Sequence, residues 1–207
     1  MSQAVGSLKR RIETVLEDFK RARTTWHEIS TDGFSTANAL VNATIQSRYV
    51  DEPGYWHPAL LQEFPNVVHA YHKKMQWIIH QHHDKLTSIS QKMRKQYDKM
   101  RQQFMEIQAI SKRLVDLQGE EYVQTVPLYK TCPMIVYVNR MEAIVSMYTN
   151  AMGTVDMLLG EKGMLNVKSR EEGLTLLSTW MNHPSINDSV INEFEDLLKV
   201  EIYEKAA

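Results

Sequence analysis

The chain has 207 residues, of which 43% are hydrophobic and 24% are charged, with a formal net charge of −1. These values are ordinary for a folded globular protein and exclude a uniformly basic or acidic chain. A single cysteine, Cys132, excludes an internal disulfide and favours a reducing compartment. No segment approaches the roughly 20 apolar residues of a membrane-spanning helix, and residues 1–9 lack a signal-peptide core. We therefore expect no membrane partner and no secretory targeting.

The first predicted helix covers residues 5–29. Its apolar residues alternate three and four positions apart, which is the pattern of a coiled-coil seam. They are Val5, Leu8, Ile12, Val15, Phe19, Ala22, Trp26 and Ile29. The pair Asp32-Gly33 predicts the end of this helix, and Ser35 predicts the cap of a second helix that reaches about Arg48.

Residues 49–65, the corner segment, combine turn-forming residues with large apolar ones. Three prolines and Gly54 lie among Tyr55, Trp56, Leu60, Leu61 and Phe64. A solvated linker would not carry this many large apolar groups. We expect the corner segment to pack down as a folded corner, with a short helix over residues 59–64.

The longest predicted helix covers residues 66–117 and contains no glycine or proline. Its apolar residues recur every three or four positions from Tyr71 to Leu117. At about 1.5 Å per residue, such a helix would be roughly 75–80 Å long. No single domain of this size covers such a rod alone, so we expect other helices to lie along it.

Two prolines mark the connection that follows. Gly119 to Pro133 is predicted to be an extended strap over a helix, and Pro133 begins another helix that ends at Gly160. The second helix repeats the alternating pattern with Val138, Met141, Val145, Tyr148, Met152, Val155 and Leu159.

The last quarter predicts two short helices. Ser169 caps the first, three residues before Glu172, and Ser185 caps the second. The predicted inward residues are Leu174, Leu177, Trp180 and Met181 in the first helix, and Ile186, Val190, Phe194 and Leu197 in the second. The predicted class is all-α: an elongated helical hairpin or coiled-coil bundle over 1–160, built on one very long helix, and a small C-terminal helical subdomain over 161–207.

Histidines form the one cluster that suggests chemistry. His69 and His72, and likewise His80 and His83, lie one helical turn apart, with Asp84 one turn beyond His80. This spacing fits two or three metal ligands, but no cysteine or second carboxylate completes the set. We prefer a polar, titratable helix face and keep a helical metalloprotein as a third hypothesis.

Nucleophilic and nucleotide chemistry have little support. No catalytic motif surrounds Cys132, and the chain has no glycine-rich phosphate loop. We predict no enzyme, no cofactor, no metal and no small-molecule substrate.

Five cations, the basic stripe, cluster in the long helix: Lys92, Arg94, Lys95, Lys99 and Arg101. Such a density of positive charge suits phosphate contacts with nucleic acid. A solvated helix face has the same composition, and the acidic C-terminal quarter is an alternative partner within the chain.

The two regular seams leave two alternatives open. Each suits a helix of a partner protein and equally a hairpin within this chain. The candidate partner-binding residues are Val5, Leu8, Ile12, Val15, Phe19, Trp26, Val138, Met141, Val145 and Tyr148.

Scattered positions carry a resemblance to a known family. They are Trp26, Asn42-Ala43, Phe64-Pro65 before the long helix, the helix that Pro133 begins, and Trp180 before the closing helix. This arrangement resembles the AIRIM-type ribosome maturation factors, small helical partners of Afg-class AAA+ ATPases.

The resemblance implies a non-enzymatic adaptor in ribosome biogenesis. It would pair with a coiled-coil protein and would link this partner and a AAA+ ATPase to pre-ribosomal large subunits. The basic stripe, Lys92 to Arg101, is our candidate contact for the pre-ribosomal particle or its rRNA. The implied location is cytoplasmic and nuclear. The alternative is a coiled-coil subunit of a tethering, cytoskeletal or chromosome-associated complex, which would have no ATPase partner.

Overall fold

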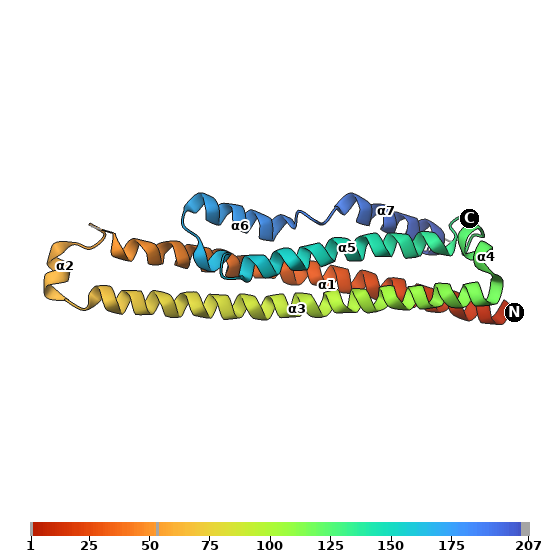
Figure 1. Cartoon of the computed structure of the whole chain (residues 1–207), viewed down its shortest axis with the longest axis horizontal. Helices are drawn as coiled ribbons and strands as arrows, with labels where there is room; N and C mark the ends of the chain where they lie inside the picture. The colour runs from red at the N-terminus through yellow and green to blue at the C-terminus, as the bar shows by residue number, and fades with distance from the viewer. Residues whose placement is uncertain (1, 53, 204–207) are drawn as a thin grey trace. The chain divides into compact units, whose positions relative to one another are not determined.

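The structure, a computed structural model, describes residues 2–52 and 54–203 (Figure 1). Within these ranges the chain is helical, with an isolated antiparallel bridge between Pro127 and Pro133 and no strand. The α-helices are α1 (Ser2–Arg48), α2 (Pro58–Glu63), α3 (Val67–Gln118), α4 (Glu120–Thr125), α5 (Met134–Leu159), α6 (Arg170–Asn182) and α7 (Asp188–Leu198). Two short 3-10 helices, η1 (Tyr49–Asp51) and η2 (Met164–Asn166), and a terminal π-helix, η3 (Lys199–Tyr203), complete the described elements. The predicted all-α class is confirmed.

Helix α1 does not end where the sequence predicted. It continues through Asp32 and Gly33, so the predicted break and the separate second helix are wrong. A Cβ atom at Gly33 would stand 2.9 Å from Cζ2 of Trp180 and 3.0 Å from Cγ2 of Ile89. This glycine therefore allows close packing inside a helix and does not form a turn.

Helix α3 confirms the predicted long helix to within one residue at each end. It begins just after Phe64-Pro65, and Gly119 follows its last residue with φ of 90°. This left-handed backbone conformation favours glycine and allows the chain to leave the helix direction.

The connection after α3 differs from the predicted extended strap. Its first half forms α4, which Glu120 and Glu121 favour because carboxylates stabilise the first turn of a helix. Its second half is a turn closed by the bridge between Pro127 and Pro133. Helix α5 follows directly, as predicted from Pro133.

The two short C-terminal helices exist, with corrected details. Ser169 caps α6 as predicted, because its hydroxyl accepts the Glu172 N–H at 3.2 Å. Leu174 and Met181, predicted to lie inward, are both 57% exposed. Asn187 caps α7 instead of Ser185. The buried residues of α7 therefore shift to Ile191, Phe194 and Leu198, and the predicted Val190 and Leu197 are only half-buried.

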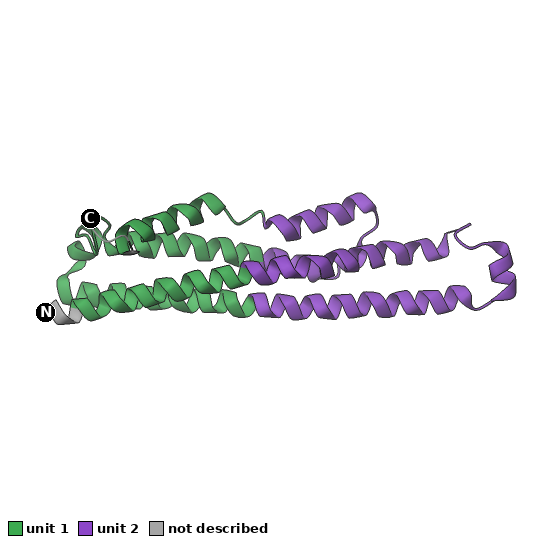
Figure 2. Cartoon of the chain, turned by 180° about the vertical axis from the view of Figure 1, so that it is seen from behind, with its two compact units in different colours: residues 1–26, 94–151, 184–207 green, residues 27–93, 152–183 purple. Residues whose placement is uncertain are grey.

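The chain divides into two compact units (Figure 2). Unit 1 comprises residues 1–26, 94–151 and 184–207, and unit 2 comprises residues 27–93 and 152–183. The predicted boundary at residue 160 is not followed, because segments distant in sequence pack together within each unit. In particular, residues 161–207 are shared between the units and do not form a subdomain of their own.

Each unit has its own apolar core. In unit 1, Trp26 is fully buried and meets the Tyr148 ring edge to face, with ring centroids 5.0 Å apart. In unit 2, Trp180 and Leu40 are fully buried. No helix among the described residues combines the length and apolarity needed to cross a membrane.

Candidate interaction surfaces

The seam residues predicted to bind a partner lie in the core of unit 1. Trp26 and Met141 have no exposed surface, and six others are also buried: Ile12, Val15, Phe19, Val138, Val145 and Tyr148. Val5 and Leu8 are half-buried. A side chain without exposed surface cannot contact another protein while the unit is folded. The structure therefore uses these residues within the chain, which is the hairpin alternative left open by the sequence.

Arg23 forms a partly buried ionic link in unit 1. Its guanidinium donates to Oε1 of Glu195, and Lys20 Nζ lies 3.2 Å from the other carboxylate oxygen of Glu195. Burial lowers the pKa of Arg23, and Tyr148 opposes this effect. Burial also raises the pKa of Tyr148 to about 12 despite the neighbouring guanidinium. This group of residues joins α7 to α1 and has a structural role.

Glu201 makes a second polar link in unit 1. Its carboxylate accepts the backbone N–H groups of Lys130 at 3.0 Å, Thr131 at 3.1 Å and Cys132 at 3.3 Å, and also the Thr131 hydroxyl. Burial alone would raise the pKa of Glu201, but these hydrogen bonds outweigh it and hold the pKa at about 2. The link fastens η3 to the turn before α5. The helical spacing of the last helix placed Glu201 on its inner face, and Glu201 is buried, but its hydrogen-bond partners were not predicted.

The basic stripe is exposed on α3, where nucleic-acid contact was predicted. Arg101 lies over the ring of Tyr97, 5.8 Å from its centroid, and the other members are Lys92, Arg94, Lys95 and Lys99. Beside Lys99, unit 1 has a polar hollow of about 390 Å³ that Arg21 and Asp18 also line. Phosphate groups could approach these side chains from solvent.

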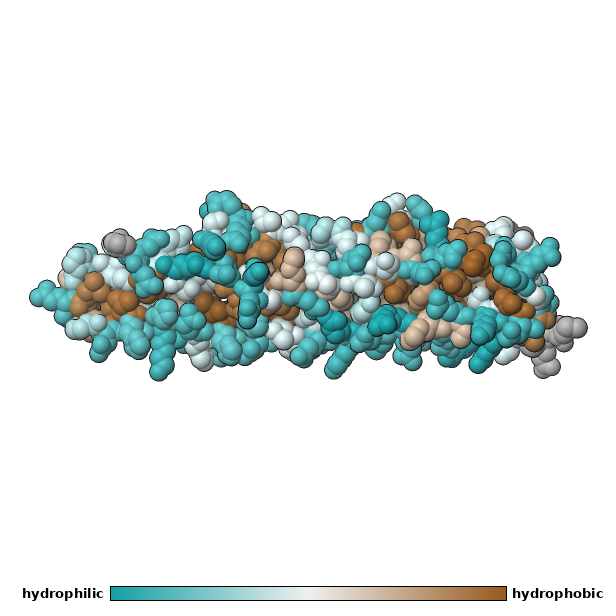
Figure 3. Space-filling model, viewed as in Figure 1, coloured by the Kyte–Doolittle hydropathy of each residue, from teal (hydrophilic) through white to brown (hydrophobic). Residues whose placement is uncertain are grey.

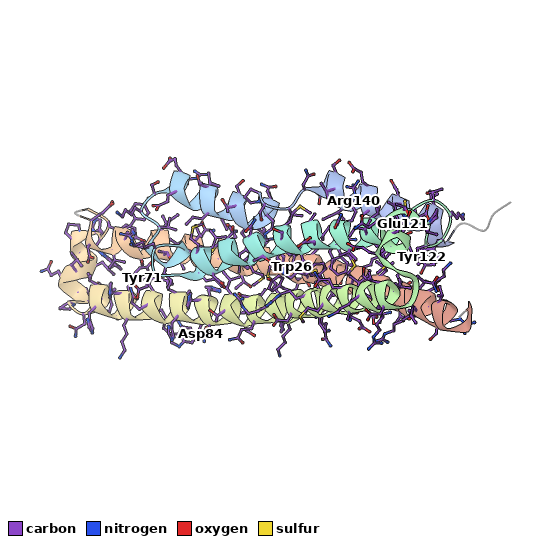
Figure 4. The ribbon with its side chains drawn as sticks, turned by 45° about the vertical axis from the view of Figure 1, so that its right-hand side comes forward. Trp26, Tyr71, Asp84, Glu121, Tyr122 and Arg140 are labelled. Atoms are coloured by element: carbon purple, nitrogen blue, oxygen red, sulfur yellow. The ribbon has the colours of Figure 1, made fainter. Side chains whose placement is uncertain are left out.

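Two carboxylates of the acidic C-terminal quarter, which was the alternative partner of the basic stripe, pair with cations on other helices. Glu195 pairs with Arg23 and Lys20 of α1, and Glu193 lies 3.3 Å from Arg140 of α5, which Figure 4 labels. Glu195 and Glu193 of α7 therefore neutralise cations of α1 and α5, respectively.

Three of these histidines border a polar groove of about 520 Å³ in unit 2. Its lining comprises Ser47, Arg48, Asp51, His72, Gln76, Ile79, His80, His83 and Leu165. His80 lies 3.6 Å from Asp84, and both side chains are mostly exposed (Figure 4 labels Asp84). His83 instead contacts the backbone oxygen of Leu159 at 3.2 Å.

This arrangement does not bring together the ligands that the metalloprotein hypothesis requires. His80, His83 and Asp84 do not converge, and in the described part of the chain no three histidine, cysteine or carboxylate side chains are placed to hold a metal ion. His69 is exposed and does not line the groove.

The corner segment behaves differently from its prediction. The short helix exists as α2, but none of its residues is buried. Five large side chains of this segment, which we call the apolar tip, are exposed: Tyr49, Tyr55, Leu60, Leu61 and Phe64. On the face shown in Figure 3, brown apolar atoms gather at the end of unit 2 that carries α2. The prediction that this segment packs down is therefore wrong for the residues of the tip.

Specific contacts nevertheless order the corner segment. The indole N–H of Trp56 donates to the backbone oxygen of Val50 at 2.9 Å, and Val50 is buried. The Trp56 ring meets the ring of Tyr71 edge to face at 5.3 Å (Figure 4 labels Tyr71). His57 caps α2 by accepting the Ala59 N–H at 3.2 Å. The apolar tip is thus presented by a folded segment.

Residues 49–65 carried a partial signal for this surface. Their aromatic and leucine side chains between prolines were noticed, but they were assigned to a core.

In comparisons with known proteins, the chain matches no protein family, and no curated protein is similar to it.

Proposed function

We propose that this protein is a non-enzymatic helical adaptor that works by binding other macromolecules. The observation that carries the proposal is the apolar tip of unit 2, where large apolar side chains stand in water on an ordered segment. Apolar surface of this kind marks interaction sites in folded proteins. The packed helices of unit 2, to which the tip belongs, support it.

The specific setting that we propose follows the resemblance of the sequence to AIRIM-type ribosome maturation factors. The adaptor would link a coiled-coil partner and a AAA+ ATPase to a pre-ribosomal large subunit, in the cytoplasm and nucleus. Two positions of the resemblance lie at the starts of helices, since Phe64-Pro65 precede α3 and Pro133 precedes α5.

A contact with rRNA is part of the proposal and would use the basic stripe. Its five side chains are exposed on one long helix and need only reach phosphate oxygens. Tyr97 of the same region is buried, so its ring is not offered for base stacking. The proposed contact therefore relies on phosphates alone.

The test is quantitative co-purification of the tagged full-length chain from cells, read by mass spectrometry. We expect enrichment of a AAA+ ATPase, a small coiled-coil protein and assembly factors of the large ribosomal subunit. Enrichment of tethering, cytoskeletal or chromosome-associated proteins instead would contradict the ribosomal setting and favour the alternative.

A further inference from the structure

We propose that Trp77 and the lysines around it on α3 form a binding site for single-stranded RNA, in which an unpaired base stacks on the indole ring. The site lies in unit 2 and adds base stacking to the RNA contact of the basic stripe. It rests on the proposed function for its biological setting. Its ligand chemistry is an unpaired base on a phosphate backbone.

Trp77 is a tryptophan that the fold leaves in contact with water. It is 51% exposed, whereas Trp26 and Trp180 have no exposed surface. Trp56 is half-buried in the corner segment, where its indole N–H donates to Val50. Trp77 instead lies on a regular stretch of α3. A large aromatic ring is therefore accessible to a ligand and is held by a helix rather than by a loop.

The side chains around Trp77 are suited to phosphate. Lys73 and Lys74 lie one turn before it, Gln81 lies one turn after it, and Lys85 follows one turn later. All four are exposed, and together with Trp77 we call them the stacking face. Lys74 Nζ lies 4.0 Å from the centroid of the indole ring. A base on the accessible surface of the ring would therefore have an ammonium group close to its own phosphates.

The neighbours of Trp77 also distinguish between kinds of ligand. A protein interface surrounds its anchors with other apolar groups, and a helix that lies on a membrane needs a continuous apolar face. A nucleobase needs one aromatic ring for stacking and cations for its phosphates. The other exposed residues between positions 73 and 81 are all polar: Lys73, Lys74, Gln76, His80 and Gln81. This composition fits a nucleobase better than a protein or a lipid surface.

Three lysines and one carboxylate set the charge on this part of α3. From Val67 to Lys85, the three lysines of the stacking face are accompanied by Asp84 alone. The carboxylate of Asp84 lies 3.6 Å from Nε2 of His80. Three lysines against one aspartate leave an excess of positive charge, which attracts phosphate groups.

The helix that packs along α3 in unit 2 adds no opposing charge here. Residues 33–47 of α1 contain no charged side chain. They lie along α3, because Gly33 closely approaches Ile89 and Ser47 lines the polar groove together with Gln76. The positive charge of the stacking face is therefore not neutralised from α1.

The remaining charges nearby either offset each other or are more distant. The polar groove has one cation in its wall, Arg48, and one carboxylate, Asp51. Glu52 and Glu63 precede the start of α3, and Trp77 lies ten residues into that helix. Ten residues of helix span about 15 Å, which exceeds the screening length of about 8 Å at physiological salt. The lysines of the stacking face therefore dominate the local field.

The experiment compares two ligands with the same number of phosphates. Fluorescent oligouridine offers unpaired bases, and an abasic oligomer of the same length offers only the sugar-phosphate backbone. In anisotropy titrations with the full-length chain, we expect oligouridine to bind at least about fivefold more tightly, because a stacked base contributes this much. Oligouridine should also quench the fluorescence of the exposed indole, and Trp77→Phe should remove this quenching.

Two substitutions at Trp77 separate stacking from apolar contact. Trp77→Leu keeps an apolar side chain without an aromatic ring, so it should lower the affinity for oligouridine to that for the abasic oligomer. Trp77→Phe keeps a ring and should retain part of the preference. Leu174→Ala is the matched control, because Leu174 is exposed on α6 of the same unit, and it should change neither affinity. Circular dichroism should show native helicity for all variants.

The lysines are tested through their charge. Lys73→Gln combined with Lys74→Gln should weaken both oligomers, because both carry phosphates. It should also lower the slope of log K against log salt by roughly 0.7 for each lost contact. The Trp77→Leu variant should leave this slope unchanged, since it removes no charge.

Ultraviolet cross-linking of the tagged full-length chain in cells identifies the natural ligand. We expect cross-linked RNA, in smaller amount for Trp77→Leu than for the wild type. Three results would overturn the inference: equal affinity of the wild-type chain for the two oligomers, a preference for oligouridine that persists in Trp77→Leu, or cross-links to DNA in place of RNA.

The same experiments separate the stacking face from the proposed function. If the two oligomers bind equally and both weaken when Lys95 and Lys99 are replaced by glutamine, the stacking face fails and the phosphate contact of the basic stripe stands. If oligouridine binding depends on Trp77 but the cross-linked RNA is not ribosomal, the stacking face stands and the ribosomal setting fails.

Discussion

Cζ2 of Trp180 lies 2.9 Å from the point that a Cβ atom at Gly33 would occupy. The indole N–H of the same Trp180 donates to the backbone oxygen of Ser30 at 3.1 Å, so this edge of the ring is held against α1. Gly33→Ala should therefore destabilise the protein by about 1–2 kcal/mol, because overpacking outweighs the gain in helix propensity. Urea unfolding followed by circular dichroism measures the change.

Gly153→Ala provides the matched control. Gly153 also lies inside a helix, α5, but nothing stands within 4 Å of a Cβ atom at this position. The alanine should stabilise the protein by about 0.5–1 kcal/mol. Equal effects at the two glycines would show that close packing against Trp180 does not explain Gly33.

The helical period was sufficient to predict the long elements. Apolar spacing and the absence of glycine and proline located α3 to within one residue, and Pro133 located the start of α5. Gly33 was misread because a glycine in a turn and a glycine under a tryptophan look the same in sequence. Only the long-range contact with Trp180 distinguishes them.

Burial was harder to predict than helix bounds. Leu60, Leu61 and Phe64 resemble core residues by type, yet α2 buries none of its residues. Leu174 and Met181 similarly fall on the exposed side of α6. Which side of a short helix faces the core depends on neighbours that are distant in sequence, so a window of local residues does not determine it.

The link between Arg23 and Glu195 should contribute measurably to stability. Glu195→Ala leaves the partly buried Arg23 without this carboxylate and should cost about 1–3 kcal/mol. Asp18→Ala removes a more exposed carboxylate, 3.7 Å from Arg21, and should cost less than about 0.5 kcal/mol. The free energies of unfolding of the two variants in urea test this ranking, and a larger loss for Asp18→Ala would contradict it.

Glu201 should make the protein sensitive to strong acid. The hydrogen bonds from Thr131 and its neighbours hold the folded-state pKa at about 2, below the ordinary 4.5. The folded state therefore favours the carboxylate, and its contribution is fully present above pH 4.5 and is lost as the pH falls toward 2. Glu201→Gln should remove that part of the pH dependence and should cost about 1–3 kcal/mol at pH 7. Urea unfolding across this range measures both effects, and an unchanged acid slope in the variant would count against the link.

His183 should act in a higher pH range. Burial, with a smaller effect of His27, lowers its pKa from 6.5 to about 4, and its Nε2 lies 2.6 Å from the Ser30 hydroxyl oxygen. The unfolded state therefore binds a proton more readily than the folded state. Stability from this residue is present above pH 6.5 and falls as the pH is lowered toward 4.

His183→Asn is the informative variant, because asparagine tolerates the left-handed backbone of this helix end, with φ of 41°. It should flatten the stability curve between pH 6.5 and 4 without breaking the cap of α6. Thermal unfolding at several pH values tests this expectation. A slope that persists unchanged in the variant would assign the acid sensitivity to other groups.

The proposed contact between the basic stripe and RNA should be made through phosphates. Replacing Lys95 and Lys99 by glutamine should weaken binding of a single-stranded RNA and lower the slope of log K against log salt by roughly 0.7 for each lost contact. Lys112→Gln with Arg113→Gln is the control, because these exposed cations lie on the same helix outside the stripe. Fluorescence anisotropy at several salt concentrations gives both quantities. Salt-independent binding, or equal losses in the two variants, would show that the stripe is a solvated helix face.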